Sequence, residues 1–115
     1  MEYKRSDRVA DLLLEVVSEL LAKEVNDPRI GSVTLTGAEV SKDLRQARIY
    51  FTLLGEEKRK EEVLAGLKSA AGFIRAKVGR ELKLRLVPTI EFVYDEAPDQ
   101  ARRIEDLLQQ VKKDN

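Results

Sequence analysis

The spacing of apolar residues changes along this chain, and the change limits the folds open to it. Between Val9 and Val25 the apolar residues recur mostly at gaps of three and one, which lays a stripe along one helix face. Between Val33 and Leu53 they alternate with polar residues, the pattern of half-buried strands. One helix followed by strands, in 115 residues that are 43% hydrophobic, predicts a single α+β domain.

Local signals place the first elements. Ser6 or Asp7 is positioned to cap the first helix, and Asn26-Asp27-Pro28 should end it, because proline disfavours helical geometry at the residue before it. The apolar phase shifts at Gly37, which predicts a bulge or bend in the first strand. A turn at 41–43 then joins two strands that should pair as a hairpin, closed by Gly55.

The second half predicts two helices, a strand and a last helix. A helix beginning at 56–60 should be interrupted at Ala70-Ala71-Gly72 and then resume. Alternation from Leu82 to Tyr94 predicts a long third strand. A final helix, from about residue 96 and ending in a short tail, should cap the fold with Ile104, Leu107, Leu108 and Val111.

This order predicts an α+β sandwich of two layers, in which helices cover one side of a three-stranded sheet. The elements would run α-β-β-α-kink-α-β-α over residues 1–115. No internal repeat or long linker divides the chain.

Positive charge gathers in one segment, although the whole chain has 21 basic and 21 acidic residues. The segment from Leu67 to Pro88 contains six basic residues and a single acidic residue, Glu81. A break at Gly72 would expose helix amides, which attract phosphate, and the small residues there would let another backbone approach. Cations at the head of the first helix oppose its dipole and would be offset by an external anion. The candidate polyanion-binding residues are Lys4, Arg5, Arg8, Lys68, Ser69, Ala70, Ala71, Gly72, Arg75, Lys77, Arg80, Lys83 and Arg85.

Each candidate also has a structural interpretation. The cations could form an ordinary solvated face, and the helical angles of Arg75, Lys77 and Arg80 do not coincide. Gly72 could simply end one helix. The larger aromatic residues are assigned to the core, because most lie in core-facing phases and form no base-stacking pairs; they are Tyr50, Phe51, Phe73, Phe92 and Tyr94.

Composition argues against catalysis. The chain has no cysteine, which excludes disulfides and thiolate metal sites, and no histidine, which removes the commonest general base and metal ligand. We expect no cofactor, no metal and no enzymatic activity. The N-terminus leads into an amphipathic pattern and resembles neither a signal peptide nor a membrane span, so we expect a cytoplasmic protein.

Five segments, in order and at compatible spacing, resemble the ribosome-binding factor A family over nearly the whole chain. They are Arg5-Ser6-Asp7-Arg8-Val9; Asp27-Pro28-Arg29-Ile30-Gly31; Ser41-Lys42-Asp43-Leu44 with Ala47-Arg48-Ile49-Tyr50-Phe51-Thr52; Ala71-Gly72-Phe73-Ile74-Arg75; and Leu84-Arg85-Leu86-Val87-Pro88.

The resemblance implies a KH-like fold of the second type, with an Ala-x-Gly kink at Ala70-Ala71-Gly72 in place of the usual glycine loop. It also implies a non-catalytic factor that binds 16S rRNA of the free or immature 30S subunit, assists its late maturation and pre-rRNA processing, and supports growth in the cold. Other assembly factors, including a GTPase, would be partners. The chain lacks the long charged extension that some members carry, and we expect a monomer with no membrane contact.

Two alternatives remain open. The chain could be a protein-interaction module that uses its C-terminal helix or a sheet edge, with loss of function when Leu107 or Leu108 is changed. An enzyme would need a carboxylate, lysine or tyrosine in a cleft.

Overall fold

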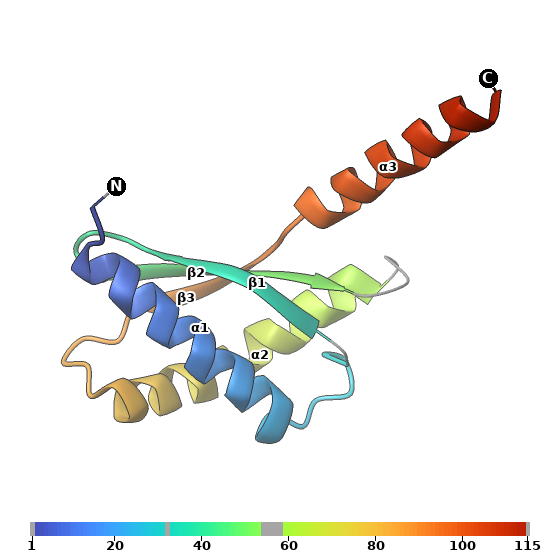
Figure 1. Ribbon diagram of the computed structural model, residues 1–115. Helices are drawn as coiled ribbons and strands as arrows, with labels where there is room; N and C mark the ends of the chain where they lie inside the picture. The colour runs from blue at the N-terminus through green and yellow to red at the C-terminus, as the bar shows by residue number, and fades with distance from the viewer. Residues whose placement is uncertain (1, 32, 54–58, 115) are drawn as a thin grey trace.

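A computed structural model describes residues 2–31, 33–53 and 59–114 (Figure 1). The helices and strands follow in the order α1 (Arg5–Lys23), β1 (Val33–Val40), β2 (Gln46–Leu53), α2 (Lys60–Leu82), β3 (Thr89–Tyr94) and α3 (Ala97–Asp114). The expected hairpin end at Gly55 and the helix start at 56–58 lie outside the described residues.

The sheet is mixed, with β2 between β1 and β3. β1 pairs antiparallel with β2, and the register shifts between Leu35 and Gly37, so that Thr36 is an extra residue in the ladder. This confirms the bulge predicted from the change of apolar phase. β3 pairs parallel with β2, a connection that requires a crossover, and α2 makes it.

The core lies between one face of the sheet and the two helices α1 and α2, as the two-layer prediction requires (Figure 1). Ile49 and Phe51 of the central strand are fully buried. The helices cover them with apolar side chains that are also fully buried: Leu13 and Val17 from α1, and Val63, Leu67, Ile74 and Val78 from α2.

The ends of α1 differ slightly from the expected ones. The helix begins at Arg5, so Asp7 lies in its first turn, where its carboxylate accepts a hydrogen bond from the Lys4 backbone N–H at 2.9 Å. Asp7 therefore satisfies a free helix-end donor from inside the helix. The helix ends at Lys23, before the expected stop at 26–28.

The predicted break at Ala70-Ala71-Gly72 is wrong, because α2 is one uninterrupted helix of 23 residues. Gly72 does not adopt a positive φ; among the described glycines only Gly31 does. A glycine inside a helix costs about 1 kcal/mol relative to alanine, which is less than the flanking apolar residues gain by packing on the sheet. No helix amides are therefore exposed at Gly72.

The predicted third strand is too long. Leu82 ends α2, Lys83 adopts a left-handed conformation with φ 52°, and β3 starts only at Thr89. Leu86, expected to face the core, is 68% exposed. Lys83 and Arg85 consequently lie in the loop after α2 and not on a strand.

The predicted capping role of the last helix is also wrong. α3 extends away from the sheet and from the other helices (Figure 1), and its described side chains from Gln100 to Lys112 are all exposed. Phe73 was assigned to the core, but it is 44% exposed because it lies off the buried stripe of α2. Across the described residues, no helix is both long and apolar enough to cross a membrane.

Glycine positions in α2 give opposite stability predictions. A Cβ at Gly66 would lie 2.9 Å from Cγ1 of buried Ile30, whereas a Cβ at Gly72 would meet nothing within 4 Å. Gly66→Ala should lower the free energy of unfolding by about 1–3 kcal/mol through overpacking. Gly72→Ala should raise it by about 0.5–1 kcal/mol through helix propensity. Urea unfolding measures both, and a destabilised Gly72→Ala would contradict an uninterrupted helix.

The turn after α1 should be sensitive to acid. The Arg29 guanidinium donates to Asp27 at 2.7 Å, and with the Arg29 backbone N–H it holds the pKa of that carboxyl below its usual 3.8. A lowered pKa means that the ionised carboxyl stabilises the fold above about pH 4 and stops doing so as the pH falls through the folded-state pKa.

Asp27→Asn should therefore be less stable than the parent at pH 7, and the difference should shrink as the pH falls below about 4. Urea unfolding of both proteins along a pH series checks this. A difference that stays constant down to about pH 2 would assign the effect to packing and not to charge.

Candidate nucleic-acid interface

The outward face of α2 presents three of the predicted residues together. Gly72 lies four positions after Lys68 and eight positions before Arg80. At about 100° of rotation per residue the three positions fall within one face of the helix, and all three residues are exposed. The space above Gly72 is open, since a Cβ there would contact nothing within 4 Å. A ligand backbone can therefore approach the helix closely between two cations.

The loop after α2 adds two further cations. Lys83 is the C-cap residue, and its backbone N–H donates to the Gly79 carbonyl. Arg85 follows in the same loop, and both side chains are exposed. We call Lys68, Gly72, Arg80, Lys83 and Arg85 the basic surface. Its four cationic side chains form no ion pair with any described residue, so they are available to phosphate groups.

Arg75 has a structural role instead. Its Nε donates to the Pro88 carbonyl at 3.1 Å, and one terminal nitrogen donates to the Val87 carbonyl at 3.2 Å. Gly79 leaves room for Val87 of the same loop, because a Cβ at this position would lie only 2.7 Å from Cγ2 of Val87. Arg75 and Gly79 therefore hold the loop that carries Lys83 and Arg85.

Lys77 faces α1 and not the basic surface. Its ammonium lies 3.1 Å from a carboxylate oxygen of Glu24 and 5.8 Å from the centre of the Phe73 ring. The cations of α2 thus do not share one face, as their helical angles indicated. Ser69 is exposed, while Ala70 and Ala71 are half-buried.

Phe73 borders a small hollow between α2 and the end of α1. The hollow has a volume of about 250 Å³ and is lined by Ser69, Ala70 and Phe73 together with residues 24–27. Its rim carries both signs of charge, Glu24 and Asp27 against Lys77 and Arg29, and both acids are paired. It is not a concentrated positive site.

Lys4, Arg5 and Arg8 are exposed at the start of α1. Figure 1 shows the first turn of α1 and the loop after α2 toward the same end of the molecule. These three residues therefore remain candidates for a second contact, separate from the basic surface.

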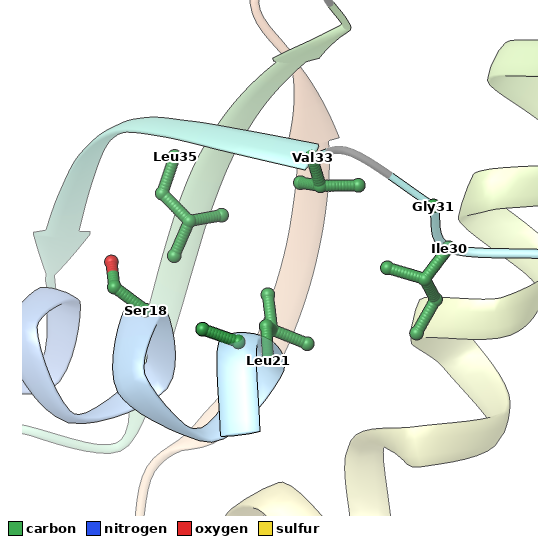
Figure 2. Close-up of a pocket in the computed structure, with 7 residues that line it drawn as sticks. Ser18, Leu21, Ile30, Gly31, Val33 and Leu35 are labelled. Atoms are coloured by element: carbon green, nitrogen blue, oxygen red, sulfur yellow. The ribbon is translucent and has the colours of Figure 1, made fainter. Parts of the chain in front are cut away.

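A further depression lies between the end of α1 and β1 (Figure 2). It measures about 140 Å³, and among the lining residues that the structure describes Ser18 has the one polar side chain, beside apolar residues such as Leu21, Ile30 and Val33. Such a surface lacks the convergent polar groups of a catalytic pocket. The part of the chain that the structure describes also contains no cluster of three potential metal ligands.

Sequence reasoning missed three features of this region. The roles of Arg75 and Gly79 depend on the loop at 83–88 folding back onto α2, and no local pattern signals that contact. The exposure of Phe73 could have been predicted from the sequence, because the residue falls outside the helical stripe of Leu67, Ile74 and Val78.

The chain matches the family described as Ribosome-binding factor A over residues 5–108. Two curated proteins of that name, from Geobacter metallireducens and Trichlorobacter lovleyi, are each 50% identical to it. The matches cover 95% and 96% of this chain and 92% and 90% of theirs.

Solved structures agree. A solution structure of a ribosome-binding factor A protein from Thermotoga maritima is 29% identical, has a TM-score of 0.75 and covers 84% of this chain and 92% of its own. A homology model of Thermus thermophilus ribosome-binding factor A, fitted into a cryo-EM map of a 30S complex, is 25% identical, has a TM-score of 0.60 and covers 84% of this chain and 97% of its own. The mixed sheet and its helices have the KH-like fold of these proteins, and this chain belongs to the ribosome-binding factor A family.

Proposed function

We propose that this protein is a non-catalytic assembly factor that binds the 16S rRNA of the free or immature 30S subunit. It assists late maturation of the subunit, including pre-rRNA processing, and supports growth in the cold. Family membership and the related Thermus thermophilus protein in a 30S complex support this proposal.

The basic surface is the observation that carries the proposal. Lys68 and Arg80 lie on either side of the open position at Gly72 along α2, and Lys83 and Arg85 follow in the next loop. None of these cations has a described acidic partner. In a chain of zero net charge, such a grouping directs phosphate to one place on the molecule. Since no helix N-terminus opens at Gly72, these contacts are made by side chains and not by backbone amides.

The mode of action follows from these contacts. Phosphate contacts position the protein on folded RNA and carry little sequence information, so recognition depends on backbone shape. If the protein binds one arrangement of the RNA more tightly than the others, the population of that arrangement rises to the extent set by the difference in affinity. No bond is made or broken. The factor would act in the cytoplasm, and other assembly factors, including a GTPase, would meet it on the subunit.

Reversing charge on the basic surface should weaken binding. In the triple variant Arg80→Glu/Lys83→Glu/Arg85→Glu, three attractive contacts with phosphate become repulsive. The affinity for purified 30S subunits, measured by co-sedimentation, should fall by at least about tenfold. The matched control reverses three exposed cations elsewhere, Lys23, Lys42 and Arg45, for the same change in net charge. Equal loss in both variants would show a nonspecific effect of net charge.

The same contacts should make binding salt-dependent. The logarithm of the association constant should fall linearly with the logarithm of salt concentration, and the triple variant should have a shallower slope because fewer counterions are released. A slope that is unchanged in the triple variant would remove these three residues from the interface.

Filling the open position should weaken binding without unfolding the protein. Gly72→Leu projects a side chain from the outward face of α2, and leucine is a better helix former than glycine. We expect stability at or above that of the parent and a clear loss of affinity for 30S subunits. Thermal unfolding controls for the fold, and unchanged affinity would show that RNA does not approach this position.

A further inference from the structure

The hollow between α2 and the end of α1 adjoins the basic surface along α2. Phe73, which lines the hollow, directly follows Gly72 of the basic surface. Arg80 comes seven residues after Phe73, two helical turns further along the same face. An RNA strand that lies across Gly72 toward Arg80 therefore runs beside the hollow.

Phe73 offers an aromatic ring at this border. Its side chain is 44% exposed, although its neighbour Ile74 is completely buried. Proteins that bind single-stranded RNA commonly stack unpaired bases on exposed aromatic side chains and hold the phosphates with nearby cations. An exposed phenylalanine next to the basic surface has the position that such a stacking contact needs.

The polar groups that line the hollow suit a base and not a phosphate. Glu24 directs one carboxylate oxygen to Lys77 at 3.1 Å, and its other oxygen has no hydrogen-bond partner among the described residues. The Asn26 amide, which can both donate and accept, also makes no hydrogen bond to a described residue. A carboxylate repels phosphate, but it accepts hydrogen bonds from the amino group of a base.

We propose that the hollow holds one unpaired base of the bound RNA, stacked on Phe73 and carrying an exocyclic amino group. The volume of about 250 Å³ lies below the usual range of about 300–1,000 Å³ for sites of drug-sized ligands, so it suits one base and not a whole nucleotide. Cytosine, adenine and guanine carry such an amino group. Uracil presents a carbonyl oxygen instead, which would meet the Glu24 carboxylate unfavourably.

This site would add a sequence preference to a contact that otherwise depends on backbone shape. Phosphate contacts fix the position of the RNA, whereas a base held between Phe73 and Glu24 is read at its edge. The site rests on the proposed function, because the cations of the basic surface must hold the strand beside the hollow.

Binding of labelled oligocytidylate and oligouridylate, each of about nine nucleotides, tests the base preference by fluorescence anisotropy. The two bases have nearly the same size, and uracil lacks the amino group, so the parent should bind oligocytidylate at least about fivefold more tightly. Glu24→Gln should bring the two affinities closer together. Release of Lys77 in this variant acts on phosphate and therefore on both oligonucleotides alike. Equal affinities in the parent, or no binding of either oligonucleotide, overturn the proposal.

Substitution of Phe73 tests the stacking. Phe73→Leu keeps an apolar side chain of good helix propensity but removes the ring, so the affinity for oligocytidylate should fall by about tenfold. Phe73→Tyr retains the ring and should bind like the parent. The control Leu12→Ala removes an exposed apolar side chain of α1 outside the hollow and should leave binding unchanged. Thermal unfolding checks the fold of each variant, and parent-like binding by Phe73→Leu contradicts stacking.

Salt dependence separates this site from the basic surface. Stacking releases no counterions, so Phe73→Leu should bind purified 30S subunits more weakly while the slope of log affinity against log salt stays that of the parent. The triple variant of the basic surface should instead bind weakly with a shallower slope.

The two proposals therefore fail in different ways. If the triple variant binds 30S subunits like the parent, the proposed function fails. If the triple variant binds weakly and Phe73→Leu binds like the parent, the base site fails and the proposed function stands. Loss of 30S binding in Phe73→Leu without loss of oligocytidylate binding also overturns the base site, and it would assign Phe73 to a protein of the subunit.

Discussion

Burial of the inner face of β2 is the interaction on which the rest of the structure depends. Ile49 and Phe51 are completely enclosed, and both α1 and α2 pack over them. Because β3 lies parallel to β2, the chain must cross over the sheet between them, and α2 is that crossing. The buried stripe of α2 fixes the rotation of the helix about its axis and thereby directs Lys68, Gly72 and Arg80 outward.

The sequence predicted the elements whose signals are local and uncontested. The stripe of α1, the hairpin and the bulge beside Gly37 all follow from spacing alone. Prediction failed where two patterns overlap. The alternation from Leu82 onward also suits a helix end followed by a loop, and the return of Val87 against Gly79 decides between them through a contact that no local pattern contains.

The candidate site was predictable in composition but not in arrangement. Counting charge found the cations, yet the pairing of Lys77 with Glu24 and the contacts of Arg75 with the 83–88 loop depend on tertiary structure. The sequence also pointed to the wrong glycine, Gly72, as the one with a special structural role, for the same reason. Gly66 and Gly79 are the positions where packing excludes a side chain, whereas Gly72 is open to solvent.

Polar contacts of Asp95 and Glu96 hold the base of α3. The Asp95 carboxylate accepts the Ala97 backbone N–H at 3.0 Å and the Thr36 hydroxyl at 2.8 Å, and Lys60 lies 3.6 Å from Glu96. An 18-residue helix is about 27 Å long, so a rotation of about 10° at this base moves its tip by about 5 Å. A change of angle at this base therefore displaces the far end of α3 much more than it displaces the residues beside Asp95.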